Sequence, residues 1–272
     1  MIKGIIFDLD DTLTIHEKIY NKEYIRISQE ISKNIIDKNT LEIIIKKINE
    51  IGSIKYFKKY LDAKFGGRDI LWGDIGGSGE VNEFISTSYN IIRTEIWKEI
   101  TKNILGINNI NISEISNNHI HNMWEMIEAY DDVIPVLLKL KRLKLAVLTN
   151  GMAIHQRRKL AKSGLLYFFS GKNRQILTSS EIKFGKPFPH GYEIIIKNFK
   201  LSKNEILMVG DRPEGDILGA NKLGIKSVYI NRENENISNN EFRPTYEINS
   251  MYELLEIIAT VSYTHLTLPT KA

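Results

Sequence analysis

Cysteine is absent from the 272-residue sequence, which excludes disulfide bonds, thiolate metal ligands and a cysteine nucleophile. No apolar run approaches the roughly 18 residues that a membrane-spanning helix requires. No leader with a basic and then an apolar segment precedes the first apolar run. The formal net charge is only +4, and the basic residues do not form the concentrated stripe that nucleic-acid binding usually requires. We therefore expect a cytoplasmic protein without a membrane or nucleic-acid partner.

The composition that remains is that of an ordinary globular protein, with 42% hydrophobic and 26% charged residues. The length fits one large domain or two, at about 150 residues per domain. No pattern in the sequence sets the oligomeric state.

The N-terminal stretch combines a short apolar run with a cluster of acids. Ile2 and residues 5–7 have the character of a buried parallel strand, and Asp8, Asp10 and Thr12 follow directly. Ligands of open α/β sheets collect at the carboxyl ends of the strands. The two-residue spacing places Asp8 and Asp10 on one face of an extended segment, where a cation between them would relieve their repulsion. A solvated acidic turn is the alternative interpretation.

Residues 15–130 show helical spacing and few strand signals. Three sets of apolar residues carry this spacing: Ile19, Tyr20, Tyr24, Ile27 and Ile31; Leu41, Ile44, Ile45 and Ile48; and Ile91, Ile92, Ile96 and Ile100. Glycines at 66–67 and 73–79 predict loops between the helices. We expect an all-helical module here, with Trp72, Trp97 and Trp124 in its packing. Arg68 is a candidate contact for an anionic group of the substrate.

Strands and helices alternate after residue 130. Apolar runs at 144–148, 175–178, 206–209 and 227–230 predict buried strands, and residues 246–258 predict a short strand with a final helix. This alternation favours a parallel sheet.

Polar residues follow the expected strands at the same edge of the sheet. Thr149, Lys186, Asp211 and Asp216 should therefore converge with the N-terminal acids on one crevice. A hydroxyl, a lysine and backbone amides suit a phosphoryl group, and carboxylates suit a hard divalent cation.

Each of these residues also has a structural interpretation. Thr149 can be a helix N-cap, Lys183 competes with Lys186, and Asp216 can be an acid favoured by the helix dipole. Asp11 is interpreted as a turn residue. The histidines, among them His155 and His190, show no metal-ligand spacing, and we assign them no functional role.

Four ordered motifs resemble those of the haloacid dehalogenase (HAD) superfamily. They are Asp8-Leu9-Asp10-Asp11-Thr12, Leu148-Thr149-Asn150-Gly151, Gly185-Lys186-Pro187, and Val209-Gly210-Asp211 with Asp216. A helical insert between the first two motifs is similar to the C1 cap of subfamily I. The resemblance implies an α/β fold with a Rossmann-like parallel sheet core, formed by residues 1–14 and 131–260, and an inserted helical cap, residues 15–130.

The resemblance also implies roles for individual residues. Asp8 would be the nucleophile that forms an aspartyl-phosphate, and Asp10 would act as general acid and then as base. Thr149, Asn150 and Lys186 would bind the phosphoryl group, with Lys186 also restraining Asp8.

The same resemblance implies Mg²⁺ as cofactor. Its ligands would be the Asp8 carboxylate, the Asp10 backbone carbonyl and Asp211. Asp216 would support the metal through water or hold Lys186, and Thr12 would steady the loop.

The expected function is Mg²⁺-dependent hydrolysis of a small phosphorylated metabolite of the nucleotide- or sugar-phosphate type. Asp10 favours this chemistry, because dehalogenases of the superfamily lack an acid two residues after the nucleophile. A phosphomutase, or a catalytically idle phosphate-binding protein, remains an alternative on the same motifs.

Residues 261–272 continue no pattern of the preceding helix. They match the translation of a DNA-sequencing adapter, so we expect a non-native tail from about Val261 and exclude it from the fold. Amplification of the gene would test this, since the natural sequence should diverge near Thr260.

Overall fold

The computed structural model describes residues 1–56, 91–234 and 239–263. Its core is a six-stranded parallel sheet with the order β3-β2-β1-β4-β5-β6. The strands are β1 (Gly4–Phe7), β2 (Lys144–Thr149), β3 (Arg174–Thr178), β4 (Ile206–Gly210), β5 (Lys226–Ile230) and β6 (Tyr246–Ile248). The apolar runs therefore predicted the first five strands to within about two residues, and the sixth lies at the start of the segment 246–258 predicted to hold a short strand. The α/β fold class is confirmed.

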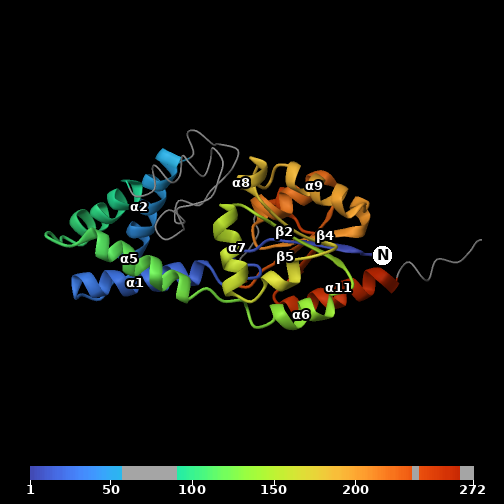
Figure 1. Ribbon diagram of the computed structural model, residues 1–272, viewed down its shortest axis with the longest axis horizontal. Coiled ribbons are helices and arrows are strands. Elements are labelled where there is room, and N and C mark those ends of the chain that lie inside the picture. The colour runs from blue at the N-terminus through green and yellow to red at the C-terminus, as the bar shows by residue number, and fades with distance from the viewer. Residues whose placement is uncertain (57–90, 235–238, 264–272) are drawn as a thin grey trace, which may run out of the picture.

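Helices cover both faces of the sheet (Figure 1). Side chains of β1 alternate: Ile5 and Phe7 pack toward α6 (Val133–Lys139), α7 (Ala153–Lys162) and α11 (Met251–Tyr263), whereas Ile6 packs toward α9 (His190–Phe199) and α10 (Leu218–Leu223). Burial on two faces explains why the central strands are almost continuously apolar. It also fixes β1 and its following acids in the middle of the sheet.

The remaining short elements connect this framework. They are α8 (Ser179–Ile182), the 3₁₀ turns η2 (Leu166–Phe169), η3 (Lys203–Glu205) and η5 (Asn240–Phe242), and the π-helical turn η4 (Pro213–Ile217). Gly164 and Gly224 follow α7 and α10 with φ of +73° and +72°. This is the left-handed conformation that glycine adopts most readily at a helix end.

A second group of helices lies beyond the carboxyl ends of the strands (Figure 1). It contains α1 (Glu17–Ser32), α2 (Lys38–Tyr56), a helix over 91–98, the π-helical turn η1 (Glu99–Ile104) and α5 (Ile112–Glu125). Its apolar residues form their own cluster, separate from the two clusters on the sheet. Trp97 and Trp124 are buried in that cluster, in agreement with their predicted packing role. Arg68, Trp72 and the predicted glycine loops lie outside the described residues.

The two chain crossings between core and helices run side by side. Ile15 N–H donates to the Glu128 carbonyl at 3.1 Å, Tyr130 N–H donates to Leu13 at 3.1 Å, and Thr14 bridges Ala129. We therefore propose residues 15–130 as a cap inserted into one core.

The C-terminal helix differs from its prediction. Helix α11 continues past the predicted helix end at Ile258 to Tyr263, and so includes the first three residues of the expected non-native tail. Residues 264–272 of the expected tail lie outside the described part of the chain. Among the described residues, no helix is both long and apolar enough to cross a membrane.

Candidate active site

The carboxylate of Asp8 lies at the end of the central strand β1, buried in the core. Its backbone N–H donates to Val209 of β4 at 2.9 Å, so the ladder of the sheet continues to this residue. The side chain accepts from the Lys186 ammonium at 2.5 Å. The neighbouring strands therefore hold a buried carboxylate against a buried cation.

Lys186 connects two carboxylates and is itself held through its backbone. Its Nζ lies 2.5 Å from Asp8 and 2.6 Å from Asp216. Burial lowers the pKa of Lys186, but the charges of Asp216 and Asp8 outweigh burial and raise it above its usual value. Asn150 accepts from the Lys186 N–H at 2.8 Å and donates to its carbonyl at 3.2 Å. Of the two candidate lysines, the structure thus places Lys186 at Asp8, whereas Lys183 ends α8 with a φ of +62°.

Three carboxylates meet beside this lysine. Oxygen atoms of Asp8, Asp211 and Asp216 all lie within 4.8 Å of one another, the one metal-ligand-like group among the described residues. Burial, followed by the charges of Asp8 and Asp216, raises the pKa of Asp211 well above its usual value. Burial also raises the pKa of Asp216 to about 6, against the opposing effect of Lys186.

These residues fit a divalent cation. Two cations, the buried Lys186 and the exposed Arg212, do not neutralise three carboxylates. Oxygen ligands at close spacing are those that Mg²⁺ prefers. Thr12 Oγ1 donates to Asp211 at 2.9 Å, a contact that the predicted role of Thr12 in steadying its loop did not include. Asp10 was predicted to contribute its backbone carbonyl, and its carboxylate is not part of the group.

The loop after β4 brings Asp216 to this place by a close approach to Gly210. The Asp216 carboxylate accepts from the Arg212 N–H at 3.0 Å. A Cβ added at Gly210 would lie 2.2 Å from Asp216 Oδ2. Only glycine leaves room for the buried carboxylate there. Asp216 is therefore more than a first-turn acid that the helix dipole favours.

The Asp10 side chain is held by a different set of partners, on helix α7. Lys159 donates to its two oxygens at 2.8 and 3.0 Å, and Gln156 donates to Oδ2 at 2.9 Å. Burial raises the pKa of Asp10, but His16 when protonated, the Lys159 charge and the hydrogen bonds outweigh burial, and the pKa falls well below its usual range. His16 Nε2 lies 3.8 Å from Asp10 and 3.0 Å from Lys159 Nζ.

Sequence reasoning did not select Gln156, Lys159 or His16. The first two stand three residues apart on the helix that follows Thr149, a spacing that places them on one side. That spacing was the available signal, since a charged and an amide side chain both point from α7 toward the acids. His16 has no such signal, because the histidines show no common spacing.

Thr149 is not the N-cap of α7, which begins after Met152 without a side-chain cap. Its buried hydroxyl accepts from Gln156 Nε2 at 2.6 Å, and the same amide nitrogen lies 3.2 Å from the Asn150 carbonyl. The N-cap alternative is therefore wrong. Asp11 has a φ of +59° and accepts from the backbone N–H groups of His16 and Glu17 at 2.9 Å, so it forms the turn that starts α1.

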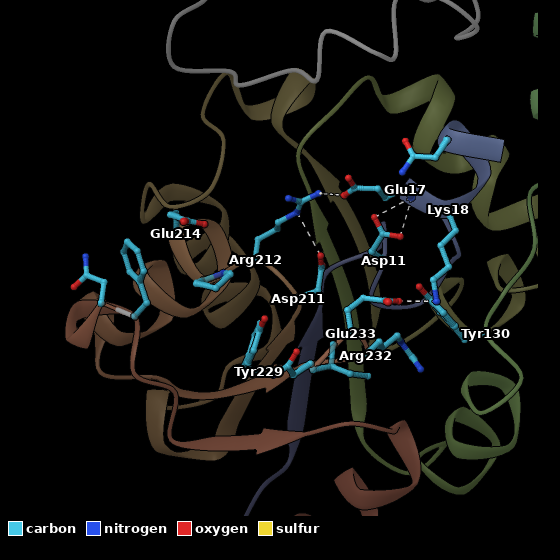
Figure 2. Close-up of a pocket in the computed structure, with 16 residues that line it drawn as sticks. Asp11, Glu17, Lys18, Tyr130, Asp211, Arg212, Glu214, Tyr229, Arg232 and Glu233 are labelled. Atoms are coloured by element: carbon cyan, nitrogen blue, oxygen red, sulfur yellow. Dashed lines mark hydrogen bonds and ion pairs between the residues drawn. The ribbon is translucent and has the colours of Figure 1, made fainter. Parts of the chain in front are cut away.

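A polar cleft of about 540 Å³ lies between α1 and the loops that follow β4 and β5. Figure 2 shows the Arg212 guanidinium between Glu17 and Asp211, at 3.5 and 3.3 Å. Lys18 faces Glu233 at 2.6 Å across the same cleft. The cleft meets the acidic cluster only at Asp211, and Asp8, Asp10 and Thr149 do not line it. Five acidic and three basic side chains line the cleft, so its net charge is negative.

Comparison with known proteins gives consistent results. Residues 2–224 match the family model of the haloacid dehalogenase-like hydrolases. The glyceraldehyde 3-phosphate phosphatase of Methanocaldococcus jannaschii is 29% identical over 265 residues, which cover 95% of this chain and 97% of that protein. The phosphoserine phosphatase of Thermus thermophilus is 39% identical over 90 residues, about a third of each chain.

Solved structures agree on the fold. The putative HAD-hydrolase YfnB of Bacillus subtilis has a TM-score of 0.64 at 18% identity, over 95% of this chain and 99% of that one. A family model over most of the chain, phosphatase relatives and the shared architecture lead to one conclusion: the chain belongs to the haloacid dehalogenase-like hydrolases and is a phosphoric monoester hydrolase.

Proposed function

We propose that the protein is a Mg²⁺-dependent phosphatase that hydrolyses small phosphorylated metabolites through an aspartyl-phosphate on Asp8. The observation that carries the proposal is the pairing of Asp8 with Lys186 inside a cluster of three carboxylates, with a further acid two residues along. A buried carboxylate beside a lysine has its negative charge stabilised and its position fixed.

In the first step, an Asp8 carboxylate oxygen attacks the phosphorus and the P–O bond to the leaving alcohol breaks. Asp10 would give a proton to the departing oxygen. Although burial raises the pKa of its carboxyl, His16, Lys159 and Gln156 hold that pKa well below the usual range, so Asp10 must first take up that proton from solvent. Lys186 and the Thr149 hydroxyl would carry the negative charge of the transferred phosphoryl oxygens.

In the second step, water attacks the phosphorus and Asp8 leaves as a carboxylate. Asp10, now ionised, accepts a proton from the attacking water, so the enzyme returns to its starting state and inorganic phosphate is released. Mg²⁺, held by Asp8 and Asp211 with Asp216 in support, would supply charge neutralisation for the phosphoryl group.

The substrate class is inferred from the relatives. The similarity over nearly the full length of a glyceraldehyde 3-phosphate phosphatase favours a small three-carbon phosphate. Partial matches to a phosphoserine phosphatase and to a pyrimidine 5'-nucleotidase of Streptococcus pneumoniae extend the panel.

Phosphate release from glyceraldehyde 3-phosphate, phosphoserine and pyrimidine 5'-nucleotides, with Mg²⁺ or EDTA, tests the proposal. We expect release that requires Mg²⁺ and disappears in Asp8→Asn, while the exposed-site control Asp131→Asn retains it. Wild-type protein quenched during turnover should carry one phosphoryl group on Asp8. Turnover that persists in Asp8→Asn would refute the mechanism, and transfer to a second sugar hydroxyl without phosphate release would favour a mutase.

A further inference from the structure

We propose that Lys159 and Gln156 are positioning residues that aim the Asp10 carboxylate for its proton transfers. This inference rests on the proposed function, because it assigns a structural cause to the general acid of that mechanism. Its basis is the contact set on Asp10, whose two oxygens are held by Lys159 and whose Oδ2 also accepts from Gln156.

The two positioning side chains are buried to an unusual degree for their types. Lys159 and Gln156 are each 1% exposed, whereas lysine is almost never fully buried unless it is paired. The desolvation of an ammonium costs several kcal/mol unless a partner compensates for it. In this chain the Asp10 carboxylate, which is 20% exposed, provides that compensation at 2.8 Å.

Gln156 joins the proton-transfer residue to the phosphoryl site. One amide nitrogen lies 2.9 Å from Asp10 Oδ2 and 2.6 Å from Thr149 Oγ1. Because Thr149 ends β2 and Asp10 follows β1, this nitrogen fixes the separation between two groups that must meet the same substrate. Lys159, three residues further along α7, contacts both carboxylate oxygens and so sets the rotation of the group.

Helix α7 is fixed in position by its packing on the sheet. Leu160 packs in the core cluster on the sheet, so the side chains next to it start from a rigid element. A group placed on such an element keeps its geometry better than a group on a loop. Asp10 lies on the loop after β1, and its contacts with α7 hold its carboxylate in place.

Leaving-group dependence tests the inference, because general-acid assistance matters only where the leaving oxygen needs a proton. An alkyl phosphate releases a basic alkoxide, whereas 4-nitrophenyl phosphate releases a stable phenolate. The value of kcat/KM covers the steps up to departure of the leaving group. The kcat/KM for the alkyl phosphate divided by that for the aryl phosphate therefore measures how much protonation by the general acid assists the departure of the leaving group. This ratio does not depend on the fraction of folded enzyme.

The variants are Lys159→Met and Gln156→Met, with Asp10→Asn as the reference and Lys162→Met as the control. Lys162 stands on the same helix and pairs with Glu125 at the surface. A misplacement of about 1 Å can cost about a hundredfold in rate. We expect kcat/KM for the fastest alkyl phosphate of the panel to fall about tenfold to a hundredfold, and kcat/KM for 4-nitrophenyl phosphate to fall less than about threefold. Lys162→Met should leave both values unchanged.

The outcomes distinguish the positioning role of Lys159 and Gln156 from the general-acid role of Asp10. A lowered ratio in Asp10→Asn, Lys159→Met and Gln156→Met, with no further decrease when Lys159→Met is added to Asp10→Asn, supports positioning. A lowered ratio in Asp10→Asn alone overturns the positioning role and leaves the general acid intact. An unchanged ratio in Asp10→Asn overturns both, since Asp10 would then not protonate the leaving group.

Discussion

The replacement Asp211→Asn should stabilise the metal-free protein and at the same time remove its response to Mg²⁺. Oxygens of Asp211 and its two carboxylate neighbours lie within 4.8 Å, and like charges at that distance repel by about 3 kcal/mol at an effective dielectric constant of about 20. Asparagine keeps an oxygen that accepts from Thr12. It loses the contact with the exposed Arg212, which is worth at most about 1 kcal/mol.

The expected net gain in the free energy of unfolding is therefore about 2 kcal/mol in EDTA at pH 8, or about 4–8 °C in Tm. The pH dependence follows from the raised pKa of Asp211. The folded wild type retains this proton at pH values where the unfolded chain has lost it, so the wild type loses stability as pH rises from near 4. The advantage of Asp211→Asn should accordingly vanish near pH 4 and grow toward neutral pH.

Mg²⁺ should reverse the order of stability. A ligand at a hundred times its Kd stabilises the folded state by about 2.7 kcal/mol, and we expect that gain only in the wild type. Thermal unfolding gives the Tm of each variant under four conditions, with EDTA or with Mg²⁺ at pH 4 and at pH 8. Asp131→Asn is the surface control. A variant less stable than wild type in EDTA at pH 8, or one stabilised by Mg²⁺ as much as wild type, would refute the account of these carboxylates as a cation site.

Three further predictions follow from close contacts and buried charge. Gly210→Ala would place a Cβ 2.2 Å from Asp216 Oδ2, so we expect a loss of about 1–3 kcal/mol in stability and a marked decrease in phosphate release. Gly191→Ala would meet Leu148 Cδ1 at 2.4 Å; chemical denaturation should show a similar loss, with KM unchanged in the folded fraction. In the cap, burial raises the pKa of Glu23, but hydrogen bonds and charges lower it to about 2. Its stabilisation of about 3 kcal/mol should be present above pH 4.5 and lost as pH falls toward 2, and Glu23→Gln should remove that pH dependence.

The sequence predicted the central strands well because β1, β2 and β4 are buried on both faces and are therefore almost continuously apolar. It also predicted Asp8, Lys186, Asp211 and Asp216, since each follows a strand or stands in a loop at the same edge of the sheet. These residues meet in the structure, although their catalytic roles stay predictions.

The contacts of Asp10 were not predictable by the same reasoning. Lys159 lies 149 positions away, and which face of α7 turns toward Asp10 depends on how the helix packs on the sheet. Periodicity gives the apolar face of a helix but not the partner of a polar residue beside it. The buried Glu23 shows the same limit in the cap, where it interrupts the face formed by Tyr20 and Tyr24.

The side-by-side crossings at Thr14 and Ala129 have a consequence for how such a protein can change. Backbone hydrogen bonds join the two ends of the insertion. The distance between these two ends is therefore fixed and does not depend on the length of the chain between them. The entropy of closing a loop rises only slowly with its length, so helices can be added, removed or exchanged there at little cost to the sheet. The helices between the two crossings can therefore be exchanged as a unit while the sheet and the acidic cluster at its edge stay unchanged.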